Sequence, residues 1–170
     1  MHSSAHTPST DQYDHVVVVG VGLIGGSIAK ALKARSLARK VTGLGRNRSR
    51  LLAAQQAGLI DEVAESVSEL TPFDLAVVCT PVDRIPQDVR ALQAIARPDS
   101  LITDAGSVKG AICEALGTPV KNVAQFIGSH PMAGSEQGGW EHADSQLFQG
   151  RTCAITPVDS EEAAVQRVEQ

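Results

Sequence analysis

The chain has 170 residues, with 15 lysines and arginines against 19 aspartates and glutamates, and a formal net charge of −4. This acidic balance argues against nucleic acid as a partner, and no apolar run approaches the ~18 residues of a membrane-spanning helix. The three cysteines are far apart and form no C-x-x-C pair. We therefore expect no metal site, and we expect free thiols, behaving as small hydrophobes, in a reducing cytoplasm.

The predicted elements begin after a polar segment over residues 1–14, which has no apolar core of a secretory signal and is expected to be a mobile tail. The next stretch, "HVVVV" from His15 to Val19, is too short for a helix and is typical of a strand buried on both faces. Ile24, Ile28 and Leu32 then recur every four residues, which predicts a helix directly after this strand.

The alternation of short apolar runs and helical periods continues along the chain. Further strands are predicted at "KVTGLG", "LAVVCT", "LITDA", "AQFIGS" and "RTCAIT", over residues 40–45, 75–80, 101–105, 124–129 and 151–156. Helices are predicted between them, with these start and stop residues: Asn47 and Gly58; Asp83 and Pro98, with Val89, Leu92 and Ile95 on one face; Val108 and Gly117. A last helix is predicted over 159–170, with Asp159 and Glu162 as its capping pair.

Strands that alternate with helices predict parallel strands joined by right-handed crossovers. The expected fold is therefore α/β, a Rossmann-type doubly wound and mostly parallel sheet with helices on both faces. Residues 15–158 are expected to form this dinucleotide-binding domain, and the helix over 159–170 is expected to lead into a second domain.

The motif "GVGLIGGS" follows the first strand and opens the first helix, which is the context that gives a G-x-G-x-x-G spacing its meaning. Gly20 permits the tight turn, Gly22 lets the backbone approach a pyrophosphate, and Gly25 lets the helix pack close to the strand. The helix start, at Leu23 and Ile24, presents unpaired N–H groups and a partial positive charge to phosphates. The motif predicts a dinucleotide site.

The end of the second strand bears on the choice of coenzyme, because NAD sites usually place an acid there to hold the ribose 2′-hydroxyl. This chain has Gly45 at that point, followed by Arg46 and Asn47. Arg46 is suited to pair with a 2′-phosphate. NADP is therefore favoured and NAD remains possible.

The third apolar strand ends in "CTPVD", and ligands of such sheets bind beyond the carboxyl ends of the strands. Thr80, Pro81 and Val82 are therefore expected to line the same crevice as Gly22, although Pro81 has the simpler alternative of only stiffening the turn.

Two further stretches, "TDAGSVKG" and "GSHPMAGSEQGG", also follow predicted strands and reach the same edge of the sheet. They combine glycine and serine with a histidine, a proline and a carboxylate. This is poor material for a core and typical of a shaped loop, where function concentrates.

Taken together, "GVGLIGGS", "DAGSVK" and "SHPMAGSE", in this order and spacing, resemble the prephenate dehydrogenase family, which includes arogenate-using members. The resemblance runs from about His15 to Pro157 and corresponds to the N-terminal coenzyme domain. It implies an oxidative decarboxylation of prephenate to 4-hydroxyphenylpyruvate in tyrosine biosynthesis. Hydride passes from the hydroxyl-bearing ring carbon to the nicotinamide, the hydroxyl proton passes to a base, and carbon dioxide leaves.

The resemblance also implies roles for single residues. His130 corresponds to the catalytic base, which suits an imidazole that is neutral near pH 7. Ser107 corresponds to the serine that positions the histidine or the substrate hydroxyl, with Gly106 beside the coenzyme, and Ser135 and Glu136 belong to the substrate-side loop. Simpler alternatives are an N-cap for Ser107 and a solvated loop charge for Glu136.

The family normally continues into a helical domain that forms a homodimer and supplies cations for the substrate carboxylates, and the resemblance implies that the last helix leads there. Two other readings stay open. One is a different dehydrogenase, such as a β-hydroxyacid dehydrogenase, which shares "GVGLIGGS". The other is a non-catalytic NADP-binding module. The choice between prephenate and arogenate also stays open.

Overall fold

A computed structural model describes residues 12–117, 122–157 and 162–169. Its strands are β1 (Tyr13–Val19), β2 (Ala38–Leu44), β3 (Glu62–Ala64), β4 (Leu75–Val78), β5 (Leu101–Asp104), β6 (Gln125–Pro131) and β7 (Cys153–Thr156). Its α-helices are α1 (Leu23–Ala34), α2 (Arg48–Gln56), α3 (Ile85–Gln93), α4 (Lys109–Leu116) and α5 (Glu162–Glu169). Two 3₁₀ turns, η1 (Val67–Glu69) and η2 (Trp140–His142), complete the described elements.

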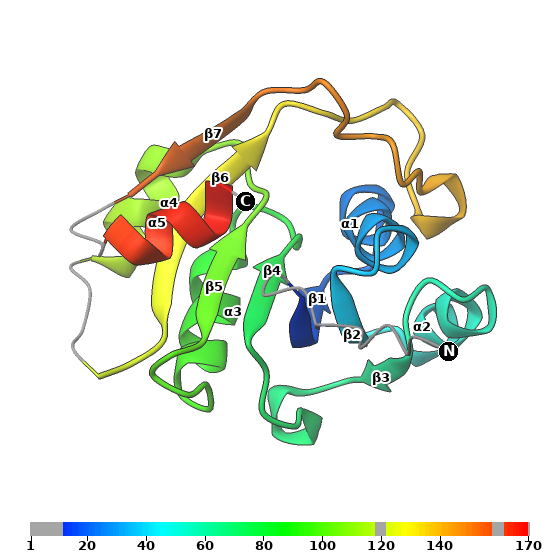
Figure 1. The fold of residues 1–170 in the computed structure, drawn as a ribbon, viewed down its shortest axis with the longest axis horizontal. Coiled ribbons are helices and arrows are strands. Elements are labelled where there is room, and N and C mark those ends of the chain that lie inside the picture. Colours follow the sequence, from blue (N-terminus) through cyan, green and yellow to red (C-terminus); the bar gives the residue numbers. More distant parts are fainter. Residues whose placement is uncertain (1–11, 118–121, 158–161, 170) are drawn as a thin grey trace, which may run out of the picture.

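The strands form one seven-stranded sheet in the order β3-β2-β1-β4-β5-β6-β7 (Figure 1). All pairs from β3 to β6 are parallel, and β7 runs antiparallel to β6, with His130 opposite Ala154. The chain first builds outward from β1 through β2 and β3, then crosses to the other side of β1 to place β4. This confirms the doubly wound α/β fold and puts the switch point between β1 and β4.

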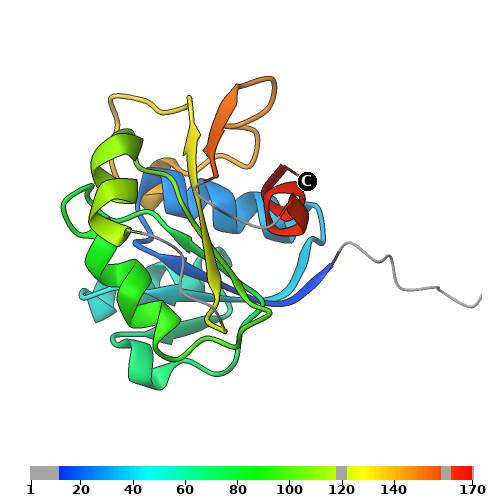
Figure 2. The same ribbon diagram turned by 90° about the vertical axis from the view of Figure 1, so that its left-hand side faces the viewer.

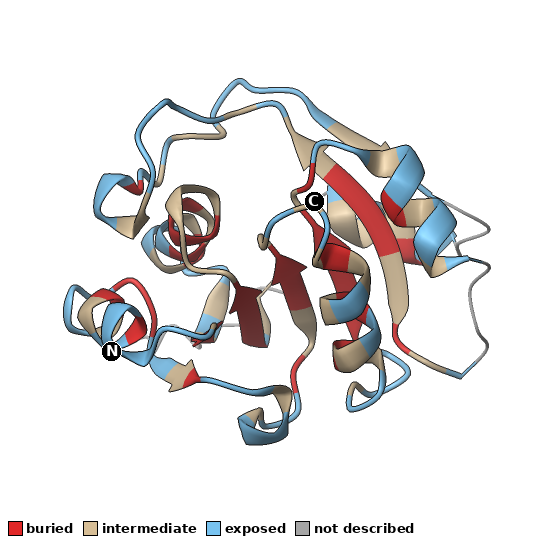
Figure 3. Ribbon diagram, turned by 180° about the vertical axis from the view of Figure 1, so that it is seen from behind, coloured by how far each residue is buried: buried red, intermediate tan, exposed pale blue. Residues whose placement is uncertain are grey.

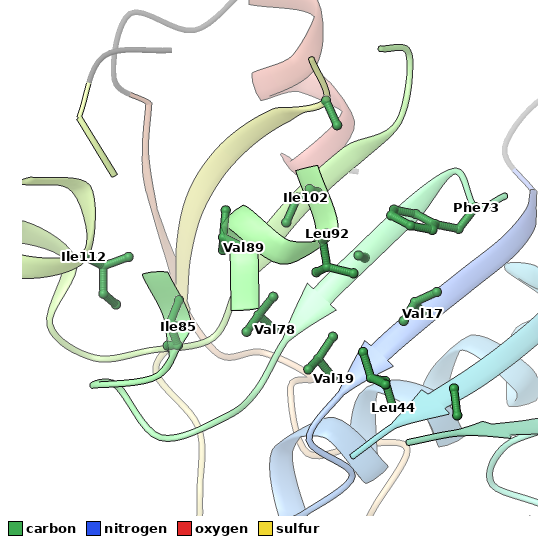
Figure 4. Close-up of a cluster of buried hydrophobic side chains, with 13 residues drawn as sticks. Val17, Val19, Leu44, Phe73, Val78, Ile85, Val89, Leu92, Ile102 and Ile112 are labelled. Carbon is green, nitrogen blue, oxygen red and sulfur yellow. The ribbon is translucent and has the colours of Figure 1, made fainter. Parts of the chain in front are cut away.

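Helices cover both faces of the sheet. Neighbouring residues of a strand point to opposite faces, so Val16 and Val18 of β1 share a core with α1 and α2, whereas Val17 and Val19 share one with α3 and α4. Figure 4 shows Val17 and Val19 among the side chains of the core shared with α3 and α4. A third cluster packs α5 on β5 and β6, so α4 and α5 lie on opposite sides of β6 (Figure 2).

Burial is concentrated in the strands, as the burial colouring of Figure 3 shows. The four valines predicted to be buried on both faces are the clearest case, because residues 16–18 have no exposed surface and Val19 has 4%. Helix exteriors and connecting loops carry most of the exposed residues, and no helix of the described part of the chain is long and apolar enough to cross a membrane.

Strand boundaries depart from expectation at several places, among them β6, which runs on to Pro131 and so includes His130. β1 begins at Tyr13, whose N–H donates to the Leu37 carbonyl at 2.9 Å, so the expected tail over 1–14 was too long at its end. Residues 1–11 of that tail lie outside the described part. β3 was not predicted, because three residues beginning with the exposed Glu62 are too few to show a strand period.

Helix ends test the capping predictions. Asn47 is the N-cap of α2, and its Oδ1 accepts a hydrogen bond from the Arg50 N–H at 3.0 Å, as predicted. Gly58 follows the end of α2 with a φ of +77°, and Gly117 is the C-cap of α4 with a φ of +72°. These glycines supply the left-handed backbone that commonly ends a helix. Of the capping pair expected for α5, Asp159 lies outside the described residues.

The prediction for α3 was wrong at both ends. Asp83 does not cap it, because the turn over residues 81–84 leads directly into the helix and Arg84 is the N-cap. Pro86 fits the first helical turn, where no N–H is needed. The helix ends at Gln93 rather than at Pro98, so Ile95 lies beyond it and is 44% exposed instead of sharing the buried face.

The cysteines are free thiols with different surroundings. Burial, reinforced by the nearby Asp104 carboxylate, raises the pKa of Cys79 to about 12. Burial also raises the pKa of Cys113. Cys153 lies in β7, in the strand predicted for it, but is exposed and so does not serve as a buried hydrophobe.

Candidate active site

A cleft of about 540 Å³ opens at the carboxyl ends of β1 and β4, at the switch point of the sheet. It brings together three of the predicted stretches: the glycine turn, the end of β2 and the segment after β4. The residues predicted for the coenzyme that line it are Gly20, Gly22, Arg46, Asn47, Thr80 and Pro81. Val82 does not line it, because its side chain packs against the core shared with α3 and α4.

Within the glycine turn, each glycine has its own structural reason. Gly20 has a φ of +87°, and a Cβ there would lie 2.9 Å from the Cys79 carbonyl oxygen. A Cβ on Gly25 would overlap the Gly20 carbonyl oxygen at less than 3.0 Å, so helix and turn can approach only because Gly25 has none. A Cβ on Gly22 would meet no atom within 4 Å. Gly22 therefore keeps the mouth of the cleft open rather than relieving a contact.

The start of α1 is a ready anion site beside this open space. Gly22 is the N-cap without a side-chain cap, and the first turn contains no acid. The N–H groups of a first helical turn have no partner within the helix, and those of Leu23, Ile24 and Gly25 occupy that turn. The turn, the missing side chain of Gly22 and the helix dipole together fit the two phosphates of a dinucleotide.

Three arginines line the cleft, Arg46 and Arg50 after β2 and Arg84 on the β4 side. Two of these arginines are engaged by carboxylates, since Arg50 pairs with Glu141 at 3.3 Å and Arg84 with Asp88 at 3.4 Å. Arg46 is exposed and makes no ion pair or side-chain hydrogen bond within the described ranges. It is therefore the cleft arginine most available to an incoming anion.

One carboxylate near Arg46 was not foreseen. The short strand β3 pairs with β2 and carries the following residue, Glu65, to the wall of the cleft. The end of β2 itself carries Gly45 in place of an acid, as noted from the sequence, but the fold brings the Glu65 carboxylate to the same cleft. Glu65 accepts a hydrogen bond from Arg48 at 3.0 Å, so its charge is already compensated.

Thr80 and Pro81 form the wall on the β4 side. The Thr80 hydroxyl donates to Asp88 Oδ2 at 2.7 Å, which ties the end of β4 to α3. This contact fixes the wall of the cleft. Pro81 lines the cleft as well as lying in the turn before α3.

The second group of predicted residues lies further along the same sheet edge, after β5 and in β6. Asp104 ends β5 with no exposed surface, and it accepts hydrogen bonds from the backbone N–H groups of Gly106 at 2.9 Å and Ser129 at 3.1 Å. Lys109, at the start of α4, forms an ion pair with Asp104 and donates to the Ser129 carbonyl at 2.7 Å. These contacts lock β5, α4 and β6 together immediately beside His130.

His130 is half-buried in β6, and Ser107 is exposed in the loop between β5 and α4. Neither side chain makes a hydrogen bond within the described part of the chain. Ser107 is not the N-cap of α4, because Val108 holds that position without a side-chain bond. The capping alternative for Ser107 is therefore wrong.

The remaining predicted residues are less central to the cleft. Gly106 is buried, and a Cβ there would lie 2.6 Å from Ile85 Cδ1, so it packs the loop against the core and does not line the cleft. Ser135 and Glu136 are exposed in the loop after β6. Ser135 Oγ accepts a hydrogen bond from the Gln137 N–H at 3.1 Å, which shapes a turn in this loop.

This loop returns to the coenzyme side of the molecule. After β6 the chain crosses to α1, where η2 lies beside that helix (Figure 1). Lys30 donates to the Ala143 carbonyl at 3.0 Å, and the Asp144 N–H donates to Ser27 Oγ at 3.0 Å. Gly139, just before η2, lines the cleft as a result.

Sequence reasoning missed the residues that act through these long-range contacts, namely Asp104, Lys109, Glu65, Arg50 and Glu141. A usable signal existed only for Asp104, since a charged residue that directly ends an apolar strand is rarely buried unless it is paired. A larger hollow of about 1190 Å³ lies between α1 and α5, and neither Ser107 nor His130 lines it.

Comparison with known proteins gives the family. The family described as "Prephenate dehydrogenase, nucleotide-binding domain" matches residues 28–170. The chain belongs to the prephenate dehydrogenase family. The match begins after the glycine turn, so it rests largely on the rest of the domain.

Curated relatives agree with this family. The chain is 33% identical to prephenate dehydrogenase of Bacillus subtilis over 149 residues, covering 85% of this chain and 39% of that protein. It is 32% identical to cyclohexadienyl dehydrogenase of Zymomonas mobilis over 146 residues, covering 85% of this chain and 50% of that protein. The chain thus spans half or less of the length of these relatives.

Solved structures agree as well. Prephenate dehydrogenase from Aquifex aeolicus in complex with hydroxyphenyl propionate and NAD⁺ superposes with a TM-score of 0.81 at 29% identity, over 92% of this chain and 55% of that one. Arogenate dehydrogenase from Synechocystis gives a TM-score of 0.81 at 30% identity, over 91% and 54%. These likenesses place the chain within the family's nucleotide-binding half.

Proposed function

We propose that this chain is the coenzyme-binding half of an NAD(P)-dependent prephenate dehydrogenase, converting prephenate to 4-hydroxyphenylpyruvate. The supporting observation is that the glycine turn after β1, the wall after β4, the Ser107 loop after β5 and His130 in β6 all stand at one edge of one sheet. Family membership supports the same reaction class. Arogenate is the alternative substrate, as the Synechocystis likeness suggests.

In this proposal His130 accepts the proton of the substrate hydroxyl. The bound nicotinamide supplies the hydride acceptor. Ser107, whose hydroxyl makes no hydrogen bond to any described residue, orients the substrate hydroxyl or His130. Asp104 and Lys109 hold the backbone of Ser129, and therefore the start of the catalytic segment, in a fixed position. A single base suffices for the proton step.

The substrate side involves further residues. Ser135 and Glu136 lie in the loop that directly follows β6, and we assign them to substrate binding on that position. We propose that residues 15–158 act as the coenzyme domain and that the helix beginning after 158 leads to a helical domain through which the complete enzyme forms a homodimer. That domain would also provide cations for the substrate carboxylates.

For the coenzyme, we propose a preference for NADP. The support is Arg46, which lines the cleft and has no carboxylate partner among the described residues, and the engagement of Glu65 by Arg48, which limits repulsion of a 2′-phosphate. NAD, which the Aquifex aeolicus protein binds in its complex, is the competing coenzyme.

Coenzyme reduction tests the function directly. The protein, alone and joined to the second domain of a relative, is mixed with NADP or NAD and with prephenate, arogenate or a panel of β-hydroxyacids. Reduction with prephenate or arogenate in the two-domain form supports the proposal. Reduction only with hydroxyacids, or binding without turnover in every form, would replace it with a hydroxyacid dehydrogenase or a non-catalytic binding module. The 170-residue chain alone is expected to bind coenzyme and to turn over slowly.

A further inference from the structure

The first turn of α2 has an unusual charge pattern. Arg46 precedes the N-cap, Arg48 and Arg50 follow it, and the turn contains no acid. The N-terminus of a helix is its positive end, so arginines there repel the helix dipole and one another. Such an arrangement is stabilised by anions, and Arg48 already has one in Glu65.

Arg50 is held by a carboxylate from a distant part of the chain. Its Nη2 lies 3.3 Å from Glu141 Oε2 and 3.5 Å from Oε1, and both side chains are about half exposed, at 55% and 51%. Glu141 belongs to η2, which the return loop brings against α1. Arg50 itself lines the cleft close in sequence to Arg46.

Gly139, which lines the cleft, lies directly beside this ion pair. Its φ is +99°, and a Cβ there would overlap Glu141 Oε2 and lie 3.0 Å from Arg50 Nη2. A residue with a side chain at this position would displace the pair or the backbone. The Arg50–Glu141 pair therefore lies against a residue of the coenzyme cleft.

We propose that Glu141 is an internal competitor for the 2′-phosphate of NADP, and that Arg50 is a second ligand of this phosphate beside Arg46. The inference rests on the proposed coenzyme role of the cleft. A phosphate carries more charge than a carboxylate and offers three acceptor oxygens, which match the planar fork of a guanidinium. On NADP binding, Arg50 exchanges Glu141 for the phosphate. NAD has only a hydroxyl there and leaves the ion pair intact.

The exchange is confined to side chains. The segment with Glu141 stays attached to α1 through the Lys30 bond to the Ala143 carbonyl and the Ser27 bond to the Asp144 N–H. Neutralising Glu141 therefore frees Arg50 without detaching η2. This makes the coenzyme preference adjustable by a residue that never has to touch the coenzyme.

Calorimetric titration of the 170-residue chain with NADP and with NAD tests the inference. Glu141→Gln is expected to tighten NADP about two- to fivefold, the range for release of one exposed ion pair, and to leave NAD unchanged. Arg50→Gln is expected to weaken NADP about tenfold, again without an effect on NAD. In the Arg50→Gln background, Glu141→Gln should have no further effect.

Glu62→Gln is the matched control, because Glu62 also forms a 3.3 Å ion pair, with Lys40, at 52% exposure, and does not line the cleft. It should change neither affinity. An unchanged NADP-to-NAD ratio in Glu141→Gln, or an equal change for both coenzymes, overturns the competitor role. Equal affinities in the unmodified chain would count against the proposed NADP preference alone, while a gain for NADP on Glu141→Gln would still support the competitor.

Discussion

Gly22 and Gly25 lie three residues apart in one turn and lack a side chain for different reasons. At Gly25 a Cβ would overlap the Gly20 carbonyl oxygen, and at Gly22 it would extend into open space. Gly25 is therefore required by the packing of the folded chain, whereas Gly22 is required only by the coenzyme that we propose to bind there.

Gly25→Ala is expected to lower the free energy of unfolding by about 1–3 kcal/mol, because backbone must move to admit the methyl group. Gly22→Ala should stay within about 0.5 kcal/mol of the unmodified chain and still lose coenzyme affinity, since its methyl group occupies the space beside the helix start. Urea unfolding and calorimetry measure the two effects. A Gly25→Ala protein of normal stability would show that the turn relaxes freely.

Arg46 is the residue on which the coenzyme preference depends. Arg46→Ala is expected to weaken NADP about ten- to a hundredfold, corresponding to a charge-assisted contact of about 1.5–3 kcal/mol, and to change NAD little. The preference should narrow as salt rises. Arg39→Ala is the control, because Arg39 pairs with Asp14 outside the cleft. Equal affinities for both coenzymes, or tighter NAD binding, would contradict the prediction.

His130 is the residue on which the proton step depends. In the two-domain enzyme, His130→Asn is expected to keep coenzyme binding and to lose about 10²–10⁴-fold in kcat, the usual contribution of a positioned base. His142→Asn, at an exposed histidine of η2, should leave kcat unchanged. Near-normal turnover of His130→Asn would remove His130 from the mechanism.

At the scale of elements, Asp104 and Lys109 join β5, α4 and β6 through a buried ion pair, with side-chain exposures of 0% and 12%. A buried pair contributes little over an apolar replacement, but removal of one partner leaves an uncompensated charge. Their main effect is to fix the relative position of three elements that meet beside His130.

Lys109→Met is therefore expected to lower the free energy of unfolding by about 3–5 kcal/mol, and the double variant Asp104→Asn/Lys109→Met to recover part of this loss. Arg39→Met, which breaks an ion pair exposed at 60% and 73%, should cost less than about 1 kcal/mol. Urea unfolding of the unmodified chain, of the single variants Lys109→Met and Asp104→Asn, and of the double variant gives the coupling energy. Additive effects in the double variant would show that the two charges do not depend on each other.

The elements that were predictable from sequence are those with a local signal. Runs of four or more apolar residues gave β1 and β4, and Asn47 was recognisable as a cap because its bond spans three residues. β3 escaped because it has three residues. The start of α3 was misplaced because a turn over residues 81–84 leads directly into the helix. Such a turn leaves no periodic pattern of apolar residues in the sequence.

In the candidate site, too, the residues that follow strands could be predicted, whereas the contacts made by loops could not. The glycine turn, Thr80 and Arg46 follow strands whose order a doubly wound fold dictates, so their meeting in one cleft could be foreseen. The contact between Arg50 and Glu141 spans 91 positions and depends on the path of a loop, for which the sequence offers no period or motif.

Across the whole molecule, one buried histidine links pH to folding. His15 of β1 is 5% exposed, and its ring contacts the Pro72 carbonyl and Thr42 Oγ1, each at 2.8 Å. Burial lowers its pKa from 6.5, with Lys40 acting in the same direction and the Pro72 bond, Glu62 and Asp74 opposing. The folded state therefore favours the neutral ring.

The stabilisation from the neutral ring is fully present above the unfolded pKa of 6.5 and is lost as pH falls through the lower folded pKa. The free energy of unfolding is thus expected to decrease on acidification below about pH 6.5, more steeply in the unmodified chain than in His15→Gln. Urea unfolding at intervals from pH 7.5 to 5 measures both slopes. Parallel slopes would show that other groups account for the acid sensitivity.

The two outer strands of the sheet carry a consequence for handling the protein. An open sheet can grow by adding strands from other molecules, because its outermost strand offers unpaired N–H and C=O groups. In this molecule the outer strands are β3, with three residues and the charged Glu62, and β7, with four. Both are too short to template a stable cross-molecular ladder, so we expect concentrated samples to resist aggregation through their sheet edges.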